Sequence, residues 1–203
     1  KGFSMAFSHS EAPVPGGAAS GSVPLPVKIV VAGGFAVGKT TFVTSISEIQ
    51  PLQTEAAMTS VSMDVDDAGS ATSKTTTTVA MDFGRITLGR DLILYLFGTP
   101  GQDRFQFMWD DLVRGSIGAV VLVDTTRLAD CFPAVDYFEQ RQVPFVVAVN
   151  CFGGAARHRI EDVREALAIS PDVPIIYTDA REREATKAAL LELVQHALVR
   201  ASR

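Results

Sequence analysis

One glycine-rich stretch of eight residues constrains this chain most, because it fits the pattern G-x-x-x-x-G-K-[ST] of a phosphate-binding P-loop. The stretch consists of Gly33, Gly34, Phe35, Ala36, Val37, Gly38, Lys39 and Thr40. A β-branched apolar run at residues 27–32 precedes it, and residues 41–47 can begin a helix. In that setting, backbone N–H groups and the helix dipole favour a bound anion. The sequence therefore predicts binding of a nucleoside di- or triphosphate.

Two residues of the loop are expected to contact the nucleotide through their side chains. Lys39 would reach the β- and γ-phosphates, and the Thr40 hydroxyl would hold Mg²⁺. The next residue, Thr41, is included among the nucleotide-binding candidates. The alternative is a glycine-rich turn that matches by chance, which the flanking strand and helix disfavour.

Composition excludes several classes of protein. The chain has 203 residues, enough for one domain and a tail, and its net charge of −5 without a basic block argues against nucleic-acid binding. Apolar runs such as residues 117–123 and 143–149 are far shorter than the ~20 residues that span a bilayer, so they predict buried parallel strands. The two cysteines, Cys131 and Cys151, make a disulfide scaffold unlikely to form and favour a cytoplasmic location.

The amino-terminal region differs in composition from the rest. Residues 1–4 resemble an expression remnant, Met5 is the expected native start, and no apolar segment of a signal peptide follows. Residues 8–26 are rich in Pro, Gly, Ala and Ser, which cannot bury enough apolar surface to fold. We therefore expect a flexible leader at residues 1–26 and one folded domain at residues 27–203.

The rest of the chain predicts an α/β fold with a six-stranded, mostly parallel sheet, one antiparallel edge strand and helices on both faces. Residues 51–77 are polar, so we expect a long functional or mobile loop whose acidic Asp64, Asp66 and Asp67 lack EF-hand spacing. Residues 79–88 and 92–97 are joined so tightly that they must form an antiparallel hairpin. The other expected strands are residues 117–124, 143–150 and 173–177, and the expected helices are 104–114, 129–140, 160–168 and 182–200.

Two further motifs resemble those of small Ras-like GTPases, over nearly all of residues 27–200. Thr78, which leads into a strand, resembles the switch I threonine, and residues 99–102 (Thr-Pro-Gly-Gln) resemble switch II. The resemblance implies that Thr78, or Thr77 in the other register, binds Mg²⁺ and senses the γ-phosphate. It also implies that the Gly101 N–H touches that phosphate and that Gln102 orients the attacking water.

The same alignment shows a departure, because the aspartate that supports Mg²⁺ in this family falls at Gly98. Asp124 is a candidate replacement, although a structural cap is the more ordinary role. Residues 51–77 contain no arginine, and Arg104 is better explained as a solvent-facing helix residue than as an arginine finger. The sequence therefore predicts slow intrinsic turnover and help from a partner.

The base-binding motifs depart further from the Ras-like pattern. Asn150 matches, and it would tie the base-binding loop to the P-loop, but Cys151 and Gly153 replace the lysine and aspartate that read the base. Cys151 can also be a small buried residue without chemistry. The segment Asp179, Ala180 and Arg181 lies where the Ras-like Ser-Ala-Lys motif does, and the Ala180 N–H would meet the base O6. We expect GTP and GDP as ligands, with weakened selectivity.

Residues 96–105 and 107–115 resemble an actinobacterial (conservon-type) family of Ras-like GTPases encoded beside roadblock-domain and sensor-kinase-like proteins, related to gliding-motility polarity GTPases. That resemblance implies a roadblock-domain partner, a sensor-kinase-like complex and recruitment to the inner face of the membrane through partners. Residues 107–109 (Phe-Met-Trp) form either a partner face or buried core. The favoured function is a GTPase switch; the alternatives are a nucleotide-binding scaffold with relaxed ATP/GTP specificity and a small-molecule P-loop kinase.

Overall fold

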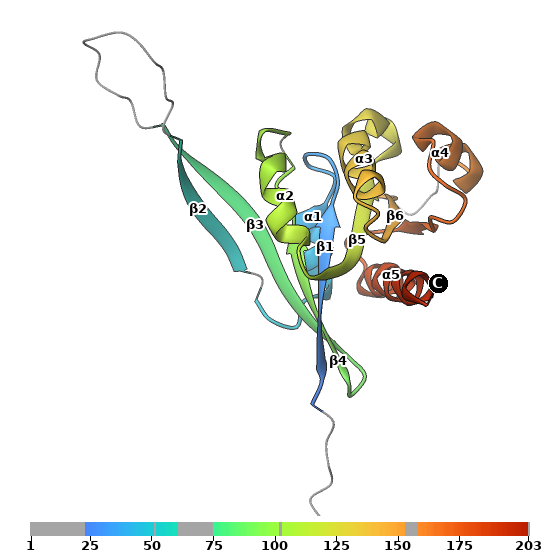
Figure 1. Ribbon diagram of the computed structural model, residues 1–203, viewed down its shortest axis with the longest axis horizontal. Helices are drawn as coiled ribbons and strands as arrows, with labels where there is room; N and C mark the ends of the chain where they lie inside the picture. Colours follow the sequence, from blue (N-terminus) through green and yellow to red (C-terminus); the bar gives the residue numbers. More distant parts are fainter. Residues whose placement is uncertain (1–22, 51, 61–74, 102, 153–157, 203) are drawn as a thin grey trace, which may run out of the picture.

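The computed structural model describes residues 23–50, 52–60, 75–101, 103–152 and 158–202. Within these residues seven strands form one sheet, in the order β2-β3-β4-β1-β5-β6-β7, flanked by helices (Figure 1). The strands are β1 Leu25–Ala32, β2 Leu52–Ser60, β3 Thr75–Leu88, β4 Leu92–Gly98, β5 Ser116–Val123, β6 Phe145–Asn150 and β7 Ile175–Thr178. The helices are α1 Lys39–Ile46, α2 Trp109–Val113, α3 Phe132–Gln140, α4 Ile160–Leu167 and α5 Arg183–Ala201, with 3₁₀ segments η1 Asp103–Met108 and η2 Thr125–Cys131.

The predicted α/β architecture is confirmed, and all six predicted strands are present. The central strands β1, β5 and β6 are parallel and almost fully buried, as their β-branched apolar sequences require. One face of the sheet packs against α1 and α5, and the other against α2, α3 and α4. Trp109 belongs to the second core, where its ring lies 5.1 Å from that of Tyr137, whereas Phe107 is 60% exposed. The sequence left open whether residues 107–109 form a partner face or core. Trp109 is part of the core, whereas Phe107 stays available for a partner.

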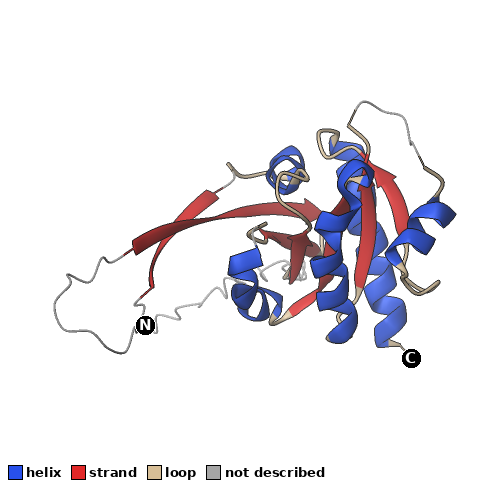
Figure 2. Ribbon diagram, turned by 90° about the horizontal axis from the view of Figure 1, so that it is seen from above, coloured by secondary structure: helices blue, strands red, loops and turns tan. Residues whose placement is uncertain are grey.

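The prediction of a loop over residues 51–77 is wrong for both of its ends. Residues 52–60 form β2, and β3 begins at Thr75, so the two strands pair in an antiparallel ribbon that extends away from the helices (Figure 2). One edge strand of the sheet is therefore β2, and β3 is antiparallel to both of its neighbours. The sequence of β2 did not predict a strand because it contains few large apolar residues. Among the described strands, β2 pairs with β3 alone. Asp64, Asp66 and Asp67 lie outside the described residues.

Two predicted helices begin as 3₁₀ structure. Residues 104–114 divide into η1 and the short α2, and residues 129–140 divide into the end of η2 and α3. Pro133 lies in the first turn of α3, where its missing N–H has no helical partner to lose. Among the described helices, none is both long and apolar enough to span a bilayer.

Candidate nucleotide-binding site

The P-loop folds around the side chain of its own lysine. The Lys39 ammonium donates hydrogen bonds to the carbonyls of Gly33, at 2.9 Å, and Gly34, at 2.7 Å. Gly38 immediately precedes α1 and has a φ of +106°, a backbone conformation that a side chain would strain. The turn thus brings Lys39 and the amino end of α1 together at the carboxyl end of β1, which is the arrangement that binds phosphate.

Burial makes Lys39 unusual among lysines. Its side chain is only 8% exposed, and burial lowers the pKa of its ammonium from 10.5 to about 8, while the carboxylate of Asp82 partly opposes that shift. A cation held away from water next to a helix amino end is a strong partner for a phosphate group, because the surrounding medium screens it weakly.

Asp82 lies at this candidate site, although no sequence motif marks it. The Thr40 hydroxyl lies 2.6 Å from the Asp82 Oδ2 and donates to it. Asp82 also lies beside Gly98, since a Cβ built on Gly98 would be 3.1 Å from the Asp82 Cβ. The register of the β3–β4 hairpin could have revealed that Asp82 is a neighbour of Gly98. Phe83 pairs with Phe97, so one step further along the two strands residue 82 faces residue 98.

The switch II loop approaches the P-loop closely at Gly101. A Cβ on this residue would lie 2.7 Å from the Lys39 Nζ and 3.0 Å from the Phe35 Cα, so only glycine fits without displacing the lysine. Thr99 is buried, and among the described residues its hydroxyl has no hydrogen-bond partner. The loop after β4 is thus in place to contact a group bound at Lys39. Gln102 lies outside the described residues.

The structure does not bring Thr78 to Thr40. Thr78 pairs with Ala57 in the β2–β3 ribbon, four residues before Asp82 along the extended strand β3. At a strand rise of ~3.3 Å per residue, its backbone lies roughly 13 Å along the strand from Asp82. In this conformation Asp82, rather than Thr78 or Thr77, is the residue of β3 that lies at the Thr40 hydroxyl.

Asn150 joins the base-binding loops to the P-loop. Its side-chain amide donates to the Val37 carbonyl at 2.9 Å, and its Oδ1 accepts the Ala180 N–H at 3.0 Å. Asn150 is 7% exposed, and a Cβ on Gly38 would lie 2.7 Å from its Nδ2. The loops after β1, β6 and β7 therefore meet at this one amide. The resemblance assigns the Ala180 N–H to the base O6, but in this structure that N–H donates to Asn150.

An aromatic ring lies exposed beside this junction. Phe152 is 49% exposed, and its Cζ is 3.0 Å from the position that a Cβ on Gly38 would take. The guanidinium of Arg181 lies 5.7 Å from the centre of the ring and pairs with Asp179 at 2.6 Å. Cys151 is half-buried, and burial raises the pKa of its thiol, which disfavours the reactive thiolate form. Gly153 lies outside the described residues.

Asp124 acts as a cap. Its Oδ1 accepts hydrogen bonds from the Thr126 N–H, at 2.9 Å, and the Thr126 hydroxyl, at 2.7 Å, and these bonds lower the pKa of the carboxyl group. Its other oxygen lies 3.4 Å from Arg127, whose guanidinium also donates to the Phe35 carbonyl at 3.3 Å. Asp124 therefore orders η2 beneath the P-loop, and its oxygens are already engaged.

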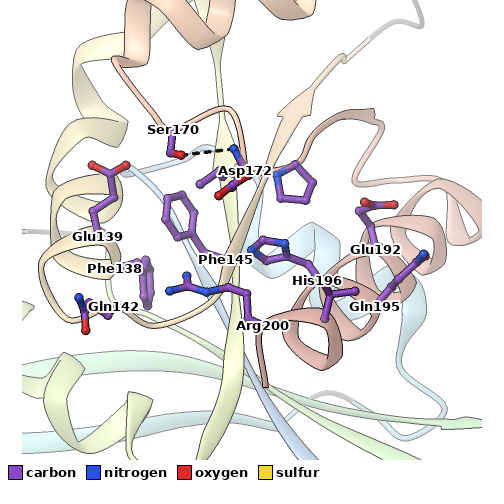
Figure 3. A pocket seen from close by; sticks show the side chains of 13 residues that line it. Phe138, Glu139, Gln142, Phe145, Ser170, Asp172, Glu192, Gln195, His196 and Arg200 are labelled. Carbon is purple, nitrogen blue, oxygen red and sulfur yellow. Dashed lines mark hydrogen bonds between the residues drawn. The ribbon is translucent and has the colours of Figure 1, made fainter. Parts of the chain in front are cut away.

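A cavity of about 620 Å³ lies at the amino ends of β6 and β7 (Figure 3), and no P-loop residue lines it. Phe138, Phe145, His196 and Arg200 are among the side chains that line it. Parallel α/β sheets bind nucleotides at the carboxyl ends of their strands. We therefore place the candidate site at the P-loop, where several loops converge.

Comparison with known proteins agrees with this geometry. The family model described as "conserved hypothetical ATP binding protein" matches residues 31–200. The chain belongs to this family. An uncharacterized protein of Methanocaldococcus jannaschii is 29% identical over 126 residues, which is 61% of this chain and 69% of that protein.

Solved structures of similar fold include G domains of the FeoB iron transporter. The cytosolic domain of T. maritima FeoB in a GDP form has a TM-score of 0.61 at 14% identity, and 86% of this chain matches 64% of that one. The G domain of Methanococcus jannaschii FeoB has a TM-score of 0.57 at 12% identity, covering 85% of this chain and 97% of its own. The fold of this ATP-binding-family protein is that of a P-loop G domain.

Proposed function

We propose that this protein is a small GTPase that binds GTP and GDP with Mg²⁺, hydrolyses GTP slowly and acts as a nucleotide-dependent signalling switch. One observation carries the proposal: the loops after β1, β4, β6 and β7 converge on the P-loop. Gly101 from β4 approaches Lys39 itself, and Asn150 fastens the base-binding loops to Val37. A ligand at the P-loop would therefore be sensed by switch II.

The fold neighbours support guanine nucleotides as the ligands. The T. maritima FeoB cytosolic domain is described in GDP and GMPPNP forms, and the GMPPNP form has a TM-score of 0.60 to this chain. The family description names ATP instead. GTP is our first choice because the chain also carries Asn150 and a switch II-like loop around Gly101.

The residues at the P-loop fit Mg²⁺, which prefers oxygen ligands and few protein contacts. The Thr40 hydroxyl and the Asp82 carboxylate provide such oxygens side by side. Bound Mg²⁺ would neutralise charge that develops on the phosphates. Lys39 would bind the phosphate oxygens, the P-loop N–H groups would orient them, and the Gly101 N–H would report the γ-phosphate. We keep Gln102 as the residue that positions the attacking water, and Thr78 as a residue that approaches only in the GTP state.

Slow turnover follows from the arginines near the site. Arg127 contacts the P-loop at the Phe35 carbonyl, but its guanidinium also pairs with Asp124 and Asp130. An arginine that neutralises the transferring phosphate accelerates hydrolysis by about 10³–10⁵. Because Arg127 is already paired with carboxylates, we expect a partner protein to supply most of that acceleration.

A second candidate function is a nucleotide-binding scaffold with relaxed base specificity. The Ala180 N–H is engaged by Asn150, so the contact that would distinguish guanine from adenine is already used. Phe152 offers the face of a ring, which stacks on any base. ATP and GTP would then bind with similar affinity.

The partner and the location stay proposals that rest on the family resemblance. We infer a roadblock-domain regulator within a sensor-kinase-like complex, with membrane recruitment through these partners. Phe107, exposed in η1 just after switch II, is the apolar side chain best placed for such a contact.

Release of phosphate from GTP by the purified chain with Mg²⁺ tests the enzymatic part of this proposal. We expect slow turnover that Gln102→Leu reduces further and that a roadblock partner accelerates. Tight GTP binding with no turnover in any of these samples would favour the scaffold. Failure to bind either guanine nucleotide would contradict the proposal as a whole.

A further inference from the structure

We propose that Asp82 supplies, from β3, the carboxylate support of the magnesium site that position 98 of β4 lacks. The inference rests on the proposed function, since it concerns the metal that accompanies the nucleotide. It assigns a role to a residue that the motifs do not mark, and it explains how a chain with Gly98 can still hold Mg²⁺.

The ladder between β3 and β4 places the two positions opposite each other. The antiparallel pairs run from Leu88 with Leu92 to Phe83 with Phe97, and the next pair in this count is residue 82 with residue 98. Side chains opposite each other in such a ladder share one face of the sheet. A carboxylate can thus move from one strand to the facing position on the other without leaving the site.

The contact distances show that side chains at positions 82 and 98 compete for the same space. A Cβ on Gly98 would lie 3.1 Å from the Asp82 Cβ and 3.2 Å from its Oδ2. The Asp82 carboxylate therefore fills the space into which a side chain at position 98 would grow. The absence of a side chain at Gly98 makes room for Asp82.

The hydrogen bond to Thr40 has the direction that a magnesium site needs. A hydroxyl has one donor and two acceptor lone pairs. The Thr40 hydroxyl donates its hydrogen to the Asp82 Oδ2 at 2.6 Å, so the lone pairs of the Thr40 oxygen stay available for a cation. A carboxylate that accepts from a metal-binding hydroxyl orients it and makes its oxygen more negative. Asp82 is therefore a positioning residue that acts through Thr40.

The other carboxylate candidate named from the sequence does not take this role. Asp124 caps η2 through Thr126 and pairs with Arg127, and among the described residues no hydrogen bond joins it to Thr40. Asp82 also interacts with the ammonium of Lys39. One half-buried carboxylate therefore accepts a hydrogen bond from Thr40 and acts electrostatically on Lys39, the two P-loop side chains expected to face a magnesium–nucleotide complex.

The test measures how Mg²⁺ slows the release of a fluorescent GDP analogue, which is a readout independent of hydrolysis. We expect Asp82→Asn to raise the Mg²⁺ concentration for half-maximal slowing by about 10- to 100-fold, the usual effect of losing an outer-shell partner. In EDTA, the rate at which Asp82→Asn releases the GDP analogue should stay within about twofold of the rate for the unchanged chain. Asp124→Asn removes the same charge from the neighbouring loop, and its Mg²⁺ response should match that of the unchanged chain.

A double variant restores the carboxylate from the other strand. Asp82→Gly with Gly98→Asp, which exchanges the two side chains, should recover most of the Mg²⁺ response, whereas Asp82→Gly alone should lose it. The double variant also keeps the test decisive where Asp82→Asn fails to fold. Both variants should be checked for a cooperative thermal transition before release is measured.

The outcomes separate the inference from the proposed function. An unchanged chain that responds to Mg²⁺, with Asp82→Asn responding equally, overturns the assignment and leaves the proposed function standing. An unchanged chain that binds no guanine nucleotide overturns both. Loss of folding in Asp82→Asn that the double variant does not repair makes Asp82 a folding residue and overturns the assignment.

Discussion

The two ends of the candidate site are built differently. The phosphate end consists of Lys39, Thr40, Asp82 and Gly101, and it brings a buried cation, a hydroxyl and a carboxylate together within hydrogen-bonding reach of the P-loop. The base end consists of Asn150, Phe152, Ala180 and Arg181, and most of its polar groups already bind one another. The comparison indicates that affinity is concentrated at the phosphates, whereas the base is held by contacts that discriminate weakly.

Lys39→Ala should have the largest effect, because it removes the buried cation that donates to two carbonyls of the P-loop. We expect nucleotide affinity to fall by about 100- to 1,000-fold, since two charge-assisted hydrogen bonds contribute ~3–4 kcal/mol. Lys28→Ala is the matched control: Lys28 donates to the Arg114 carbonyl, at the far end of β1. Calorimetric titration with GDP measures both variants. An affinity within threefold of that of the unchanged chain for Lys39→Ala would place the phosphates elsewhere.

Asn150→Ala breaks the connection between the two ends. It leaves the buried Val37 carbonyl and the Ala180 N–H without their partner, so we expect a loss of ~2–4 kcal/mol in the free energy of unfolding. Asn150→Asp keeps an acceptor for Ala180 and should lose less. Urea denaturation monitored by circular dichroism measures the difference. Equal stability of Asn150→Ala and the unchanged chain would mean that the loops are held together by other contacts.

Phe152→Ala tests the base end alone. We expect about a tenfold loss of affinity for both GDP and ADP, because base stacking on an aromatic ring contributes ~1–3 kcal/mol. Affinity for inorganic tripolyphosphate, which has no base, should not change. Leu198→Ala, which shortens another exposed apolar side chain on α5, serves as the control. A loss confined to GDP would show that the base end does select guanine.

The pH dependence of binding should be the smallest effect. Burial sets the pKa of Lys39 near 8 in the nucleotide-free chain, and phosphates bind the protonated ammonium. Affinity should therefore fall by about fourfold between pH 7 and pH 8.5, with proton uptake on binding above pH 8. The unfolded chain binds this proton up to the ordinary pKa of 10.5, so Lys39 makes the nucleotide-free fold more stable as pH rises from 8 to 10.5. In Lys39→Ala, neither the proton uptake nor this contribution should remain.

Much of the fold could be predicted from local pattern. The β-branched runs of β1, β5 and β6 identify buried parallel strands, and the P-loop motif fixes the junction between β1 and α1. β2 could not be predicted in the same way. Its sequence, LQTEAAMTS, contains few large apolar residues, and among the described strands only β3 pairs with it.

The candidate site was predicted where function depends on consecutive residues. Lys39, Thr40 and Asn150 lie where their motifs placed them, because each motif follows the carboxyl end of a strand. Asp82 was missed because its role depends on a partner 16 positions away across the hairpin. Counting the register back from the turn at Gly89 would have placed it opposite Gly98. Thr78 was placed by motif alignment, and the extension of β3 moves it outward along the ribbon.

A single titration tests the central claim, that the phosphate end provides the affinity and the base end discriminates weakly. GDP, ADP and tripolyphosphate are titrated in turn against the purified chain with Mg²⁺, and their dissociation constants are compared. We predict that all three bind, that GDP and ADP differ by less than about tenfold, or ~1.4 kcal/mol, and that tripolyphosphate retains most of the binding free energy. A chain that binds GDP tightly but neither ADP nor tripolyphosphate would contradict this account.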